Sequence, residues 1–168
     1  MKWKKIIEFW GDANLNRWSD DILQHVHLSP TSKAFLKEVG LPREIGATYK
    51  FAPLECDRIE LPGYDDYYII GYIDPVPICI EGDTGNVLFC DDEVNGNATF
   101  WNSSVEQLGI CLMHYGQYGR ECENAKEELH GSIVTKTRRK MKNADPEAFA
   151  VWEMGWPQII QEMRFGFM

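Results

Sequence analysis

The chain has 168 residues, of which 44% are apolar and 12% aromatic, and its formal net charge is −9. This length and composition favour one folded domain with a stable core and exclude a disordered tail. No apolar run is long enough to cross a bilayer, and the interrupted apolar segment at residues 1–10 is a poor secretion signal. We therefore expect a cytoplasmic protein that does not associate with a membrane.

The chain carries no internal repeat, low-complexity segment or linker that would divide it into separate domains. Residues 1–10 are typical of a short amphipathic helix. We place this helix in an N-terminal helical extension, residues 1–28, ahead of an α+β domain at residues 29–168. Both parts are expected to form a single globular unit.

A helix is predicted to begin at Ser29, whose hydroxyl suits an N-cap, and at Pro30, which suits the first helical turn. Gly40 stands where a helix ends in the left-handed conformation. Pro42 then prevents the helix from continuing.

Four runs rich in β-formers follow, at residues 67–70, 76–80, 87–90 and 98–101. The second and third runs are joined by Gly82-Asp83-Thr84-Gly85, a composition typical of a tight hairpin loop. Successive strands joined by short turns pair antiparallel. The pattern therefore predicts an antiparallel sheet.

The helical period returns after the sheet. Ser103 and Glu106 match the S-x-x-E capping box, and Gly116 and Gly119 are predicted to end the helix that follows. A second helix is predicted at about residues 124–142. The order of helix, sheet and helices predicts an α+β fold with helices packed on one face of the sheet.

A last helix is predicted after Asp145 and Pro146, and Pro157 is expected to kink or split it. Its apolar side chains recur every three or four residues and are expected to lie in the core: Phe149, Trp152, Trp156, Ile159 and Met163. Trp152 and Trp156 could alternatively stack on bases or sugars, but helical spacing favours the core.

The negative charge is concentrated in the middle of the chain. Residues 51–100 hold eleven acidic residues and one basic residue, a net charge of −10, so the rest of the chain sums to +1. Such a field repels phosphate backbones and attracts cationic surfaces. Direct binding of nucleic acid is therefore disfavoured. A basic protein partner is one interpretation, and loops made soluble by acidic residues are the other.

Two segments next to the predicted strands are rich in acidic residues: residues 63–67, which also hold two tyrosines, and residues 91–93. Tyrosine supplies contact area with few rotatable bonds, and carboxylates at the rim of an interface attract a cationic partner. The alternative is solvent-exposed loops without a partner. The candidate partner-binding residues are Tyr64, Asp65, Asp66, Tyr67, Asp83, Asp91, Asp92 and Glu93.

Two short motifs suggest chemistry, but each has a simpler explanation. Asp83-Thr84-Gly85 matches the signature of aspartic proteases, yet it occurs once and its residues also suit a turn. His25 and His27 could bind a metal from one face of a strand, but no acidic residue or cysteine lies at a characteristic spacing. An ordinary loop is favoured for both histidines. We therefore expect no metal site.

The five cysteines, Cys56, Cys79, Cys90, Cys111 and Cys122, are odd in number and lack C-x-x-C spacing, which favours reduced thiols in a cytosolic protein. Known nucleophile, phosphate-binding, dinucleotide-binding and metalloprotease motifs are absent from the sequence. A hydrolase that pairs a cysteine with His114 or His130 is an alternative that the sequence does not exclude. We expect no catalytic residues and no cofactor.

Several short landmarks occur in a fixed order along the chain. They are Phe35-Leu36 with Gly40-Leu41-Pro42, Tyr68-Ile69-Ile70-Gly71, Ile78 to Ile80, Gly85-Asn86-Val87, Asn102-Ser103-Ser104, and Asp145-Pro146 to Trp152. Together these landmarks, which span residues 30–161, resemble the SUKH superfamily, most closely its fourth subgroup of bacterial immunity proteins.

The resemblance implies a protein that binds a polymorphic toxin, often a nuclease or deaminase, and silences it stoichiometrically. It implies no turnover, and a toxin domain as the protein partner. Residues 1–28 are an N-terminal extension that a shorter member of the family would lack. Two alternatives remain: a hydrolase of unknown type, and a non-catalytic regulatory scaffold like the eukaryotic cell-wall regulators of the same superfamily.

Overall fold

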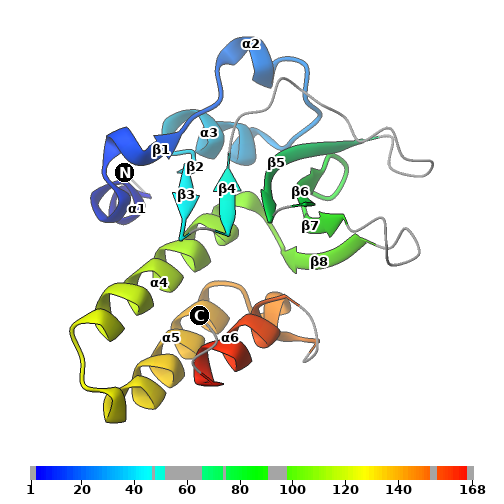
Figure 1. Cartoon of the computed structure of the whole chain (residues 1–168). Coiled ribbons are helices and arrows are strands. Elements are labelled where there is room, and N and C mark those ends of the chain that lie inside the picture. Colours follow the sequence, from blue (N-terminus) through cyan, green and yellow to red (C-terminus); the bar gives the residue numbers. More distant parts are fainter. Residues whose placement is uncertain are drawn as a thin grey trace.

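The structure is a computed structural model, and it describes these residues of the chain: 3–46, 48–51, 66–73, 75–90, 98–151 and 155–165. Along the chain, short helices come first, an antiparallel sheet follows, and three longer helical segments close the fold (Figure 1). The predicted α+β class is confirmed.

The N-terminal part contains three helices and a small two-stranded sheet. Ser29 caps the third helix as predicted, because its Oγ accepts a hydrogen bond from the backbone N–H of Ser32. Gly40 then adopts φ 77°, and a Cβ there would collide with the backbone carbonyl of Asn16. The elements are α1 (Lys4–Trp10), a 3-10 helix (Asp12–Asn14), β1 (Leu15–Asn16), α2 (Asp20–Leu23), α3 (Pro30–Glu38) and β2 (Leu41–Pro42).

Among the described residues the main sheet has six strands, and each pairs antiparallel with the next one along the chain. The four predicted strands are confirmed, including the hairpin that places Ile80 opposite Val87. Two short strands at the start of the sheet were not predicted. The strands are β3 (Glu44–Ile45), β4 (Tyr49–Phe51), β5 (Tyr67–Ile73), β6 (Val76–Glu81), β7 (Val87–Cys90) and β8 (Ala98–Asn102).

The main core lies between one face of the sheet and the helices. Ile78 and Ile80 on β6 and Trp101 on β8 are fully buried there with Phe35 of α3. Each fully buried aliphatic side chain of this size contributes about 1.5–3 kcal/mol to stability. The opposite face carries a second, smaller apolar cluster among the described residues, formed by Cys79, Leu88 and Cys90.

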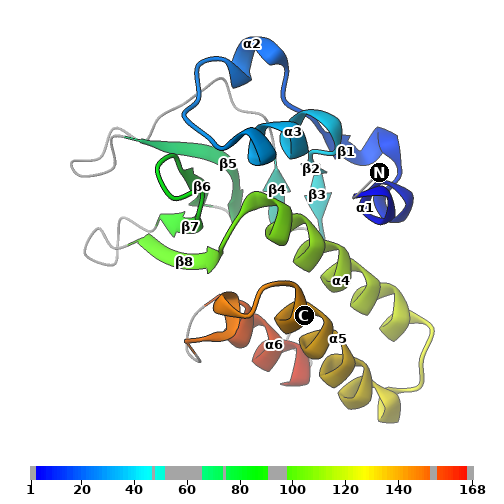
Figure 2. The same cartoon turned by 180° about the vertical axis from the view of Figure 1, so that it is seen from behind.

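The C-terminal helices run along one another beside the sheet. In Figure 2, α4 starts directly after β8 and passes in front of β3, with α5 alongside it and α6 next to α5. The elements are α4 (Val105–Glu123), a 3-10 helix (Glu127–Leu129), α5 (His130–Ala144), a 3-10 helix (Glu147–Phe149) and α6 (Trp156–Phe165).

Two sequence predictions about α4 are wrong. Its N-cap is Ser104 and not Ser103, because the Ser104 Oγ accepts from the backbone N–H of Gln107. The helix also continues through Gly116 and Gly119 to residue 123. A side chain at Gly116 would collide with aromatic rings of α1, so this glycine allows two helices to approach closely and does not end α4.

The predicted boundaries of the last two helices also differ from the structure. The helix expected at residues 124–142 begins later, at His130. The predicted last helix is divided into a 3-10 turn and α6, and the division falls before Gly155, which has φ 56°. Pro157 lies in the first turn of α6, where a missing N–H costs nothing.

A buried carboxylate joins landmarks that lie far apart in the sequence. Asp145 accepts 2.8 Å hydrogen bonds from the side-chain amide of Asn102 and from both the backbone N–H and the hydroxyl of Ser103. The amide oxygen of Asn102 accepts from the indole N–H of Trp156 at 2.9 Å. These bonds tie the end of β8 to the start of α4, the end of α5 and α6. The prediction that Trp156 is a core residue is confirmed, whereas Trp152 lies outside the described residues.

Within the part of the chain that the structure describes, no helix has both the length and the apolar composition to cross a membrane.

Candidate functional site

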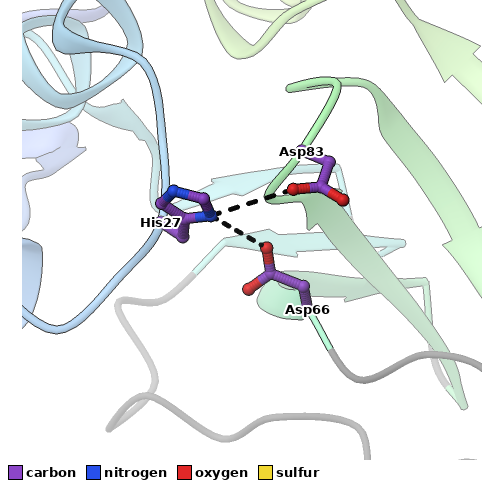
Figure 3. A group of neighbouring side chains, drawn as sticks. All are labelled: His27, Asp66 and Asp83. Carbon is purple, nitrogen blue, oxygen red and sulfur yellow. Dashed lines mark ion pairs between the residues drawn. The ribbon is translucent and has the colours of Figure 1, made fainter.

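Three ionisable side chains from separate parts of the chain meet at the turn between β6 and β7. His27 comes from the loop between α2 and α3, Asp66 precedes β5, and Asp83 lies in the turn itself (Figure 3). The Nδ1 atom of His27 lies 3.4 Å from Asp66 Oδ2 and 3.8 Å from Asp83 Oδ1. We call this group the His27–Asp66–Asp83 cluster. One imidazole nitrogen and two carboxylates can form ion pairs when the histidine is protonated, or bind a cation when it is not.

A buried tyrosine fixes two members of the cluster. The Tyr68 hydroxyl donates to Asp66 Oδ1 at 2.6 Å and accepts from the backbone N–H of His27 at 2.9 Å. Tyr68 itself is only 2% exposed because its ring packs in the main core. The fold therefore determines where the Asp66 carboxylate and the His27 backbone lie, and leaves the His27 imidazole in solvent.

The turn brings the third member close to the other two. Gly82 donates its backbone N–H to the Asp66 carbonyl at 2.7 Å, and a Cβ at this glycine would collide with the Asp66 carboxylate. The turn closes through a 2.8 Å bond from the Gly85 N–H to the Glu81 carbonyl. The Thr84 hydroxyl also donates to the Glu81 carboxylate. The prediction of a hairpin loop at Gly82-Asp83-Thr84-Gly85 is confirmed.

The predicted partner-binding residues are only partly within the described structure. Asp66, Tyr67 and Asp83 are described, and Tyr67 donates its hydroxyl to the Glu81 carboxylate across the β5–β6 pair at 2.9 Å. Asp66 and Asp83 are brought together. The remaining candidates lie outside the described residues: Tyr64, Asp65, Asp91, Asp92 and Glu93.

Sequence reasoning did not connect His27 with this surface. No acidic residue lies at a regular sequence spacing from this histidine, so the sequence does not predict it as a ligand. The fold places Asp66 and Asp83 beside it. A shallow hollow of about 330 Å³ continues from His27 and Asp83 toward Glu106 at the start of α4. The surface around the cluster is therefore polar and acidic.

Basic side chains gather elsewhere, at the α5–α6 end of the molecule. They line a groove of about 500 Å³ and include Lys136, Arg138, Arg139, Lys142 and Arg164. The residues of this groove belong to α5 and α6, which are the lower helices in Figure 1, whereas the loop between α2 and α3 that carries His27 lies at the upper end. We call the described surface around Asp66 and Asp83 the acidic end, and the groove on α5 and α6 the basic end.

Burial shifts the pKa values of His114 and of two described cysteines away from those of an activated pair. Nδ1 of His114 is hydrogen-bonded to Gln117 at 3.1 Å, and burial lowers the pKa of its imidazole. Burial raises the pKa of the Cys111 thiol to about 12, which keeps it protonated and unreactive. A hydrogen bond with Cys90, together with burial, also raises the pKa of Cys79. Cys79, Cys90, Cys111 and Cys122 are free.

The comparison with protein families gives a match over nearly the whole chain: the family model described as SUKH-4 immunity protein matches residues 4–162. The chain belongs to the SUKH-4 immunity protein family. The resemblance that the landmarks indicated is thus confirmed. No curated protein and no solved structure matches the chain.

Membership of the SUKH-4 immunity protein family gives the chain an immunity role against a toxin, and a toxin protein as its partner. Immunity proteins of this kind are generally non-catalytic. The match includes most of residues 1–28, and several side chains of that segment belong to the main core, among them Ile6, Trp18 and Leu23. The boundary that we placed at residue 28 stays a prediction.

Proposed function

We propose that this SUKH-4 immunity protein neutralises a bacterial polymorphic toxin of the nuclease or deaminase type by stoichiometric occlusion. The acidic end of the molecule docks on a basic toxin domain and covers its active site. The observation that carries the proposal is the family match, and the charge distribution indicates which end makes the contact. Toxins that act on nucleic acid need cationic surfaces, to which this end is complementary.

The contact surface in this proposal consists of the predicted partner-binding residues together with His27. Asp83 is the best-placed described member, because its side chain is 82% exposed at the tip of a short turn. Asp66 is less accessible, and its contact with Tyr68 gives it a structural role as well. A contact of ordinary size would bury about 1,600 Å² in total, so neighbouring loops take part.

Charged residues at the rim of a protein–protein interface mainly raise the association rate. We therefore expect the quadruple variant Asp65→Lys, Asp83→Lys, Asp91→Lys, Asp92→Lys to bind the toxin at least about tenfold more slowly at low salt. The matched control reverses the other end of the molecule with Arg139→Glu and Lys142→Glu. The control should bind and protect as well as the wild type.

The toxin for this experiment is the C-terminal domain encoded by a large gene immediately upstream, if that domain co-purifies with the protein. Surface plasmon resonance at two ionic strengths gives the association rates, and growth of toxin-expressing cells gives the protection. Unchanged association in the acidic-end variant would refute the proposed docking surface. Loss of protection in the basic-end control would place the contact on α5 and α6 instead.

A separate experiment tests whether the protein has catalytic activity of its own. Alanine variants at His114, His130 and the cysteines should protect cells as fully as the wild type, because occlusion needs no nucleophile. Loss of protection by a correctly folded variant would favour the hydrolase alternative.

A further inference from the structure

We propose that the His27–Asp66–Asp83 cluster binds a divalent transition-metal ion, and that zinc fits it best. The three candidate ligand atoms come from three separate segments and all lie within 4.8 Å of one another. Figure 3 shows the imidazole edge of His27 facing both carboxylates. This inference does not depend on the proposed function, because it concerns the isolated protein.

The distances between these atoms are close to those in a zinc site. Zinc bonds to histidine nitrogen and carboxylate oxygen are about 2.0–2.2 Å long, so neighbouring ligands of a tetrahedral ion are about 3.3–3.6 Å apart. The two distances from His27 Nδ1 are 3.4 Å to Asp66 and 3.8 Å to Asp83. The Asp66 and Asp83 oxygens lie within 4.8 Å of each other, and the exposed Asp83 side chain is free to adjust toward a bound ion.

The surrounding structure orients the ligands in the way that metal sites require. Tyr68 occupies Oδ1 of Asp66, which leaves Oδ2 directed toward His27. Hydrogen bonds of this kind to a ligating carboxylate fix its orientation and raise metal affinity. The Tyr68 hydroxyl also holds the backbone of His27, and Gly82 holds the backbone of Asp66. Two of the three ligand-bearing positions are therefore set before any ion arrives.

The donor set selects the class of metal. An imidazole nitrogen with two carboxylates suits zinc and its neighbours, whereas calcium and magnesium prefer ligand shells built from oxygen alone. The site is on the surface, and three protein ligands leave a fourth tetrahedral position for water or for a group from a partner. A bound ion would link the loop after α2 to the β6–β7 turn and would reduce the negative charge of this surface.

The experiment is isothermal titration calorimetry of chelator-treated protein with zinc chloride, using a Cys122→Ser background to remove the partly exposed thiol. His27→Ala is compared with His25→Ala, which deletes an exposed histidine of the same loop that is not in the cluster. Asp83→Asn tests a carboxylate at the tip of the turn. Thermal unfolding without metal confirms that each variant is folded.

We expect one zinc ion per chain with similar affinity in the parent and in His25→Ala. Affinity should fall by about tenfold or more in His27→Ala and in Asp83→Asn. Zinc should raise the melting temperature of the parent and of His25→Ala only, and an excess of magnesium should not displace it. The proposal is overturned if the parent binds no zinc below millimolar concentration, or if His27→Ala binds it as tightly as His25→Ala.

Discussion

Removal of the Asp145 carboxylate is the sharpest test of how the fold is held together. The side chain is fully buried and accepts three hydrogen bonds of 2.8 Å, from the Asn102 amide and from two donors of Ser103. A fourth, longer bond of 3.3 Å comes from the backbone N–H of Ala148. In Asp145→Ala these donors lose their partner inside the protein. A stranded buried donor costs about 1–3 kcal/mol, and one that water can reach costs less.

Asn102 is fully buried, whereas Ser103 is half-buried. The buried Asn102 amide carries the full cost of a stranded donor, and each of the two half-buried Ser103 donors carries part of it. Together these costs lower the free energy of unfolding by about 3–5 kcal/mol. Domains are stable by about 5–15 kcal/mol in total. The Asp145→Ala protein is therefore expected to lose a large share of its stability at 25 °C.

Urea unfolding followed by tryptophan fluorescence measures this loss, because Trp101 and Trp156 pack together beside Asn102 with ring centroids 5.1 Å apart. Asp145→Asn keeps one oxygen acceptor and should lose about half as much free energy. Asp21→Ala, at an exposed aspartate, is the control and should change stability by less than about 0.5 kcal/mol. A loss below 1 kcal/mol in Asp145→Ala, with an unchanged urea dependence, would show that the buried network contributes little.

Three further predictions concern glycines and a half-buried histidine. Gly40→Ala should lower the free energy of unfolding by about 3 kcal/mol or more, and Gly85→Ala by only about 1 kcal/mol. Both glycines have positive φ, but only at Gly40 would a Cβ collide with a backbone carbonyl. Within α4, Gly119→Ala should stabilise the protein by up to about 1 kcal/mol, since its Cβ position is open, whereas Gly116→Ala should destabilise it by pushing on the rings of α1. The pKa of His114 is lowered in the folded protein, so the unfolded chain binds a proton at this residue first as the pH falls. The contribution of His114 to the free energy of unfolding is therefore complete above about pH 6.5 and declines below that value. His114→Asn should flatten this decline.

Chemical unfolding at pH 7 measures both glycine pairs, and unfolding between pH 5 and 7.5 measures the histidine. Equal losses in Gly40→Ala and Gly85→Ala would contradict the close approach of α3 to β1. A stabilised Gly116→Ala protein would contradict the packing of α4 on α1. An unchanged pH dependence in His114→Asn would mean that burial of the imidazole does not limit its protonation.

Much of the sheet could be predicted from the sequence because its signals are local. The strands β5 to β8 are rich in β-forming residues, and β6 and β7 also alternate on either side of a turn sequence. Ser29 and Gly40 mark both ends of α3. Strands β1 to β4 escaped prediction because two or three residues show no period. They exist only through pairing with chain segments that the sequence does not identify.

The errors in the helices have physical causes. Two successive serines could each cap α4, and the choice is made by Asp145, which engages Ser103 and leaves Ser104 free to cap. Gly116 was interpreted as a helix end, but it is needed for contact with α1. Each outcome depends on a residue distant in the sequence.

The same limit explains why the candidate site was only half predicted. Asp66 and Asp83 were chosen for local concentration of acid and tyrosine, which is visible in the sequence. Their contact with His27 depends on a hydroxyl of β5 that holds the loop after α2 in place. No spacing rule reports such a contact.

The network around Asp145 has a consequence for motion as well as for strength. Hydrogen bonds to one carboxylate and one amide join β8, the start of α4 and α6, so none of these segments opens without disturbing the others. Their backbone amides should therefore exchange with heavy water as one cooperative unit, at rates set by the rarest opening events of the molecule.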